Sequence, residues 1–182
     1  LPGQPRKVLY SYLSRLRRIL STADVSLPQV AGGYRIDVAP EAVDLHRFDQ
    51  LLRLARSTTT EADAAAHLQE ALGLWRGEPF TGIHAPWFRQ EANRLTAVRD
   101  TALADLRDLR LQLGEHADLI PELRAALLEQ PLDERLARQT MLALYRTGRQ
   151  AEALDCYQTL RRQLADELGA DPDPLTQQLH RQ

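Results

Sequence analysis

The hydrophobic residues of this chain recur mainly at the three- and four-residue spacing of amphipathic α-helices. From Asp44, a plausible N-cap residue, to the region around Leu168, this spacing is interrupted only by short breaks that contain glycine or proline. The pattern therefore predicts a body made only of helices. The predicted helices span residues 45–57, 61–75, 86–113, 116–129, 133–147 and 150–168.

Two of the breaks are related by a fixed period. Gly114 and Gly148 lie 34 residues apart, which is the length of a tetratricopeptide repeat. Small or apolar residues follow both glycines at helical spacing, and Pro131 closes the first unit where such a repeat expects proline. The spacing favours a tetratricopeptide-like helical repeat domain, with unrelated helical hairpins of similar length as the alternative. The matching positions are Leu119, Leu123 and Ala126 in one unit and Ala153, Tyr157 and Leu160 in the next.

The N-terminal part of the chain follows a different pattern. Helical spacing over residues 6–20 predicts one helix, and two short β-prone runs within residues 25–38 flank Gly32-Gly33, a dipeptide suited to a tight hairpin turn. A helix followed by a hairpin is the order of a winged helix-turn-helix domain from its recognition helix onward. The residues predicted to form the buried stripe of the helix are Leu9, Tyr12 or Leu13, Leu16 and Leu20.

Charge separates the same two regions. The chain carries a net charge of −2, yet five Lys or Arg residues and no acidic residue precede Asp24, so the remainder carries −7. A basic end on an acidic body indicates a local anion-binding site. Cys156 is the only cysteine, which excludes an internal disulfide and fits a reducing compartment. The sequence contains no apolar run long enough to cross a bilayer and no signal peptide.

Seven phrases occur along the chain in this order: SYLSRLRRIL, GGYRIDV, VDLHRF, ALGLWRGEPF, PLDERL, LYRTGRQAEAL and LADELGADPDPLTQQLH. Together they resemble the streptomycete antibiotic regulatory protein (SARP) family of bacterial transcriptional activators. The resemblance extends over essentially the whole chain. It implies that residues 1–39 are the C-terminal part of a winged helix-turn-helix DNA-binding domain and that residues 40–182 are a helical-repeat bacterial transcriptional activation domain.

The same resemblance implies a function and partners. The family activates genes, often for secondary metabolism such as antibiotic biosynthesis, by binding direct repeats in promoter DNA and engaging RNA polymerase. It implies a protein of the bacterial cytoplasm, with a second protomer as a possible neighbour on DNA and no membrane partner. The absent initiator Met and the missing first part of the winged domain indicate a fragment, and its last residues correspond to part of the family's final helix.

The predicted DNA-binding residues lie on the first helix and the hairpin. Arg side chains can bind both phosphate and guanine, and a recognition helix lies in the major groove while the wing contacts the neighbouring backbone. Arg17 is expected to reach phosphate, Arg35 to contribute from the wing, and Tyr34 to pack the hairpin onto the helix. The groove-facing candidates are Lys7, Ser11, Ser14, Arg15 and Arg18, and Gly32 and Gly33 allow close approach of the wing.

The sequence offers no catalytic constellation. Its five histidines lack metal-ligand spacing, no glycine-rich phosphate loop occurs, and Cys156 is expected to act as a small buried hydrophobe. Trp75 and Trp87 are expected to anchor the intervening loop in the core. We therefore predict a protein that is not an enzyme and has no metal or cofactor. The alternative is a helical-repeat domain that acts as a protein–protein adaptor or a ligand sensor. In that case the winged part would be inherited structure with little role in function.

Overall fold

The computed structural model describes residues 5–23, 25–83 and 85–182, which divide into two compact units. The first unit is Leu1–Arg47 and the second is Phe48–Gln182. Each unit is described by itself.

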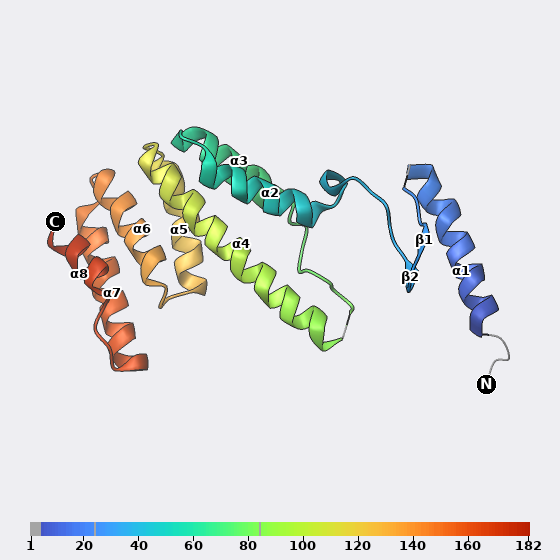
Figure 1. The fold of residues 1–182 in the computed structure, drawn as a ribbon. Coiled ribbons are helices and arrows are strands. Elements are labelled where there is room, and N and C mark those ends of the chain that lie inside the picture. Colours follow the sequence, from blue (N-terminus) through green and yellow to red (C-terminus); the bar gives the residue numbers. More distant parts are fainter. Residues whose placement is uncertain (1–4, 24, 84) are drawn as a thin grey trace. The chain divides into compact units, whose positions relative to one another are not determined.

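The first unit contains one long helix followed by a small hairpin (Figure 1). Helix α1 spans Pro5–Leu20 and leads into the short helix η1, Ser21–Ala23. Strands β1, Gln29–Val30, and β2, Gly33–Tyr34, pair antiparallel. Gly32 lies in the turn with φ +89°, a conformation that glycine adopts without steric cost. The short helix η2, Pro40–Ala42, precedes the second unit. The predicted order of helix and hairpin is therefore confirmed.

The predicted buried stripe of α1 is wrong except at Leu13, which is 8% exposed, and Leu20, which is partly buried. Leu9, Tyr12 and Leu16 are all about half exposed or more, at 52%, 60% and 47%. Amphipathic spacing correctly identifies an apolar side of the helix, but burial also needs an element to cover it. Within the described part of this unit, Leu27 and Tyr34 contact α1 at Arg17, while much of the apolar side of the helix stays in solvent.

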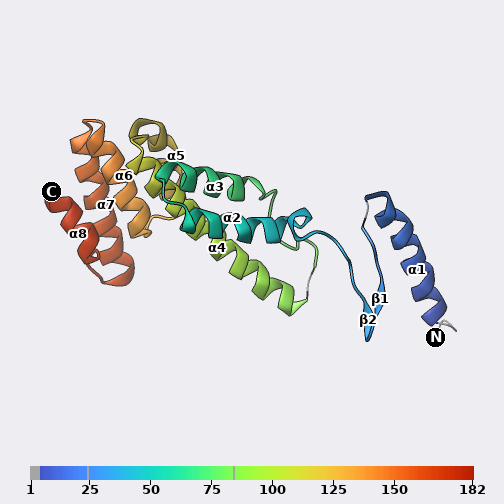
Figure 2. The same ribbon diagram turned by 45° about the horizontal axis from the view of Figure 1, so that its top comes forward.

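The second unit is an array of helices, joined by short turns except for a longer loop between α3 and α4 (Figure 2). Helices α2 and α3 pack on the middle of the long helix α4 through one core, which includes Phe48, Leu68 and Ala102. A second core, which includes Leu119, Leu123 and Leu144, joins the end of α4 to the helices that follow. The bounds are α2 Asp44–Ser57, α3 Glu61–Gly73, α4 Pro86–Gln112, α5 His116–Glu129, α6 Glu134–Arg146, α7 Gln150–Leu168 and α8 Pro174–Arg181.

The 34-residue period appears in the backbone of two turns. Gly114 and Gly148 both take positive φ, +89° and +78°, between consecutive antiparallel helices. The residue after each glycine donates its N–H to a carbonyl five residues earlier, as in a Schellman turn. The repeat domain predicted from the spacing is thus confirmed as a structural period. The two equivalent bonds run from Glu115 to Arg110 at 3.0 Å and from Arg149 to Leu144 at 2.9 Å.

Because Gly148 needs positive φ, we expect Gly148→Ala to lower the free energy of unfolding by about 1–2 kcal/mol. Gly73→Ala is the matched control, since Gly73 ends α3, its φ is not positive, and an added Cβ would meet no atom within 4 Å. Urea denaturation followed by circular dichroism measures both. The control should be neutral or more stable, and equal losses in the two variants would contradict this account.

The short helix α8 is absent from the helices predicted by spacing. Asp173 caps it by accepting the Thr176 N–H at 2.6 Å, and Pro174 occupies its first turn. Arg138 of α6 then donates to Asp173 and to Thr176, at 2.6 and 2.9 Å, and Thr176 is fully buried. These contacts hold α8 on α6, and they explain how a helix of eight residues is maintained in place.

The two tryptophans differ in their surroundings. Trp75 is partly buried and meets the ring of Phe48 edge-on, with 5.6 Å between ring centroids, so its predicted role as a core anchor is confirmed. Trp87 is 63% exposed, so the same prediction for it is wrong. It lies in the first turn of α4 on the solvent side, where only Phe88 gives it a ring contact in the described part of the chain. Phe88, not Trp87, packs on Phe80 of the preceding loop.

Candidate nucleic-acid interface

One face of α1 carries the groove-facing candidates. Lys7, Ser11, Ser14 and Arg18 follow one another at spacings of four, three and four residues, which places them in a row along one side of a helix. Arg15 follows Ser14 directly and lies beside this row. All five side chains are exposed, and none forms an ion pair within the described residues. The row therefore presents positive charge and hydroxyl groups to solvent.

Arg17 lies on a different side of α1, toward the hairpin. Its Nε donates to the carbonyl of Leu27 at 3.1 Å, and its guanidinium lies 5.3 Å from the centre of the Tyr34 ring. The predicted packing of Tyr34 against the helix is thus confirmed, with Arg17 as its partner. The bond to Leu27 uses only Nε, so the terminal nitrogens keep hydrogens for another acceptor. Arg17 therefore ties the hairpin to the helix while its charge stays at the surface.

The hairpin presents less positive charge than the helix. The guanidinium of Arg35 lies 3.5 Å from the carboxylate of Asp37, and both side chains are more than half exposed. This carboxylate offsets part of the charge that the wing would present to an anion. Gly32 and Gly33 are exposed at the turn, and an added Cβ at either position would meet no atom within 4 Å. The space around the turn is open, as a close approach to a backbone requires.

Charged residues of the helical unit mainly pair with one another. Arg135 of α6 binds Asp105 and Asp108 of α4, and Arg107 of α4 binds Glu122 of α5. Hydrogen bonds from Arg149 and then Arg124 hold the pKa of Glu152 at about 2, although burial opposes this. Glu152 is therefore an ionised ion-pair partner, not a poised acid or base. Within the described residues, no group of three or more His, Cys, Asp or Glu side chains could hold a metal ion.

Cys156 and Asp133 also have structural roles, the first as a partly buried side chain and the second as a helix cap. Burial raises the pKa of the Cys156 thiol to about 11, with Arg124 opposing the shift, so a thiolate is disfavoured at neutral pH. The side chain is partly buried, as expected for a small hydrophobe. Asp133 accepts the N–H of Leu136 at 3.0 Å and so caps α6.

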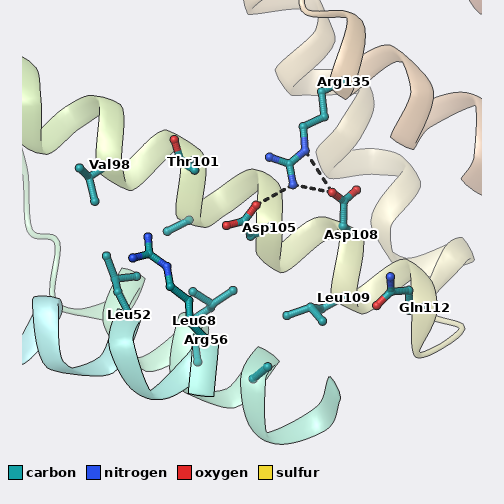
Figure 3. A pocket seen from close by; sticks show the side chains of 13 residues that line it. Leu52, Arg56, Leu68, Val98, Thr101, Asp105, Asp108, Leu109, Gln112 and Arg135 are labelled. Atoms are coloured by element: carbon teal, nitrogen blue, oxygen red, sulfur yellow. Dashed lines mark hydrogen bonds and ion pairs between the residues drawn. The ribbon is translucent and has the colours of Figure 1, made fainter. Parts of the chain in front are cut away.

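Sequence reasoning did not identify the residues around an open cavity of about 410 Å³ in the helical unit. Arg56, Asp105 and Arg135 line this cavity from three different helices (Figure 3). The spacing of Asp105 and Asp108 on α4 is a signal that both carboxylates share one side of a helix. The position of Arg135 beside them follows only from the packing of α6 on α4. Within the described residues, no helix has the length and apolar character needed to cross a membrane.

The chain is similar to a known protein family and to several bacterial regulatory proteins. Residues 43–182 match the family model described as the bacterial transcriptional activator domain. The regulatory protein AfsR of Streptomyces coelicolor is 41% identical over 98% of this chain, which spans 18% of that relative. The regulatory protein DnrI of Streptomyces peucetius is 33% identical, with 98% of this chain and 70% of DnrI covered. This chain therefore corresponds to under a fifth of AfsR but to most of DnrI.

A solved structure resembles the chain as well. Mycobacterium tuberculosis EmbR, in complex with a low-affinity phosphopeptide, matches with a TM-score of 0.79 and 29% sequence identity, covering 99% of this chain and 50% of EmbR. The relatives are named as regulatory proteins, not as enzymes. The family model covers well over half of the residues, and DnrI is matched over more than two thirds of its length. The chain thus belongs to the SARP family of bacterial transcriptional regulators that carry the bacterial transcriptional activator domain.

Proposed function

We propose that this chain is the DNA-binding and activating part of a SARP-type transcriptional activator. Residues 1–39 form the C-terminal part of its winged helix-turn-helix domain, and residues 40–182 form its activation domain. The protein binds direct repeats in promoter DNA, engages RNA polymerase in the bacterial cytoplasm and controls genes for secondary metabolites. It acts without catalysis or a cofactor.

The observation that carries this proposal is the exposed polar and cationic row on α1. Lys7, Ser11, Ser14 and Arg18 share one exposed side of the helix, with Arg15 beside them. In our proposal this side enters the major groove, where Arg can donate to guanine O6 and N7, and Lys and Ser can donate to phosphate.

The hairpin completes the proposed interface. Arg17 is tied to Leu27 and Tyr34, so a phosphate bound by its terminal nitrogens would meet the helix and the hairpin together. Gly32 and Gly33 let the turn approach the DNA backbone, and Arg35 adds a cation that Asp37 partly offsets. These contacts position the protein on the duplex and carry no sequence information themselves.

The activation domain has the opposite charge. Residues 40–182 carry −6, which disfavours their own contact with DNA and leaves their helices for protein partners. We propose RNA polymerase as that partner, with a second protomer beside it when two copies occupy adjacent direct repeats. The alternative of a helical-repeat adaptor predicts the same protein contacts without any DNA binding by α1.

A salt series on the full-length protein tests the proposal. Promoter fragments of the source genome provide the probe, and fluorescence anisotropy measures affinity between about 50 and 200 mM salt. Four contacts by Lys7, Arg15, Arg17 and Arg18 would give log K against log salt a slope of about −3 to −4 or steeper. Absence of binding at low salt, or binding without salt dependence, would contradict the proposal and favour the adaptor.

A further inference from the structure

The open cavity of the helical unit joins an apolar wall to a charged rim (Figure 3). Leu52 of α2, Leu68 of α3, and Val98 and Leu109 of α4 supply apolar surface. Its volume, about 410 Å³, lies within the range of pockets that hold small molecules. The cavity lies wholly within the second unit, so its walls are fixed by the packing of α2 and α3 on α4.

Arg135 and two carboxylates at the rim, Asp105 and Asp108, bind one another. Arg135 donates its Nε to Asp108 at 3.0 Å and its Nη2 to Asp105 at 2.6 Å. The side chain of Gln139 adds a hydrogen bond to Asp108 at 2.6 Å. Burial opposes the charge of Arg135, but the bonds to Asp105 and then Asp108 outweigh it and raise the pKa of Arg135. The guanidinium of Arg135 is therefore already bound by two carboxylates of α4.

Arg56 of α2 is the remaining charged residue of the rim. Its side chain has no hydrogen-bond or ion-pair partner among the described residues, and it reaches from α2 toward α4 in Figure 3. In that view Asp105 lies between the guanidinium groups of Arg56 and Arg135. The cavity thus offers one guanidinium with all its donors available, next to apolar side chains.

We propose that this cavity binds a small monocarboxylate with an apolar tail. Its carboxylate pairs with the guanidinium of Arg56, whose planar donors match two carboxylate oxygens, and its tail lies on the wall formed by Leu52, Leu68 and Val98. Asp105 and Asp108 repel a second negative charge, which excludes polyanions and strongly acidic peptides. The inference does not depend on the DNA interface, because no residue of α1 or the hairpin lines the cavity.

Octanoate is the probe, and isothermal titration calorimetry on the 182-residue chain is the measurement. We expect one bound octanoate per chain and an affinity at least tenfold above that for 1-octanol, which has the same tail without the charge. Arg56→Gln should lower octanoate affinity tenfold or more and leave 1-octanol unchanged. Arg53→Gln is the matched control, because Arg53 lies one turn earlier on α2, is exposed and does not line the cavity.

Asp105→Asn is expected to raise octanoate affinity, whereas Arg56→Gln is expected to lower it. Removing this carboxylate takes away a repulsion and frees part of Arg135, so octanoate should bind more tightly than to the unchanged chain. Unfolding cannot mimic this result, because a damaged cavity would bind less. Equal affinities for octanoate and 1-octanol, equal effects of Arg56→Gln and Arg53→Gln, or no octanoate binding at millimolar concentration would each overturn the proposal.

Discussion

Changing Lys7, Arg15 and Arg18 together to alanine is expected to weaken promoter binding by the full-length protein roughly a hundredfold at physiological salt. Each lost phosphate contact removes about 0.9 from the slope of log K against log salt, so the slope should fall by up to about 3. Any lost base contact adds to the loss in affinity and also relaxes sequence preference. Fluorescence anisotropy with specific and scrambled promoter fragments measures both quantities.

The matched control removes the same number of charges from the helical unit. Arg53, Arg146 and Arg162 are exposed and have no ion-pair partner within the described residues. Their joint change to alanine should leave affinity and slope nearly unaltered. Arg17 is kept out of both variants, because its loss would also release the hairpin from α1. A similar loss of affinity in the two triple variants would mean that total charge, not the α1 row, determines binding.

Leu123→Ala is expected to lower the free energy of unfolding of the helical unit by about 3–5 kcal/mol. Leu123 is fully buried in the core that joins α5 to α4, α6 and α7, so truncation leaves a cavity that the surrounding helices fill only in part. That loss is a large share of the stability of an ordinary domain. Urea denaturation, followed by the circular dichroism of the helices at 222 nm, measures this change in the free energy of unfolding.

Leu128→Ala on the same helix is the control for side-chain size and helix propensity. Leu128 is 86% exposed, so its truncation removes almost no buried surface. We expect a change within about 0.5 kcal/mol. If both substitutions lowered the free energy of unfolding by the same amount, the assignment of Leu123 to the core would be wrong.

The helices of the second unit could be predicted because their breaks are explicit in the sequence. Gly114 and Gly148 take positive φ, and Asp133 caps α6, so local chemistry sets these boundaries. Helix α8 was not found by spacing because eight residues are too few to define a period. Its position depends on Arg138, which precedes the Asp173 it contacts by 35 residues.

Burial was less predictable than helix formation. Leu16 and Trp87 are apolar residues at suitable positions of their helices, yet both are largely exposed. A pattern shows which side of a helix is apolar, whereas burial depends on what the rest of the chain places against it. The sequence alone does not show that Leu13 and Phe88 are covered by other parts of the chain while Leu16 and Trp87 are not.

The candidate sites divide in the same way. The row on α1 follows from the spacing of Lys7, Ser11 and Arg18, because all three lie on one helix. The second role of Arg17 depends on the path of the hairpin, ten residues later. The cluster of Arg135 with Asp105 and Asp108 joins residues 27 to 30 positions apart, so its existence follows from helix packing and not from any local motif.

The equivalent turns after α4 and α6 restrict which insertions and deletions this helical array can accept. Successive residues of an α-helix are rotated by about 100°, so a single inserted residue inside α6 would turn the later part of that helix away from its neighbours. Addition or loss of a whole 34-residue unit instead joins one turn to an equivalent turn and preserves the direction of every following helix. Gene duplication can therefore lengthen such an array in complete units, while small insertions are confined to its loops.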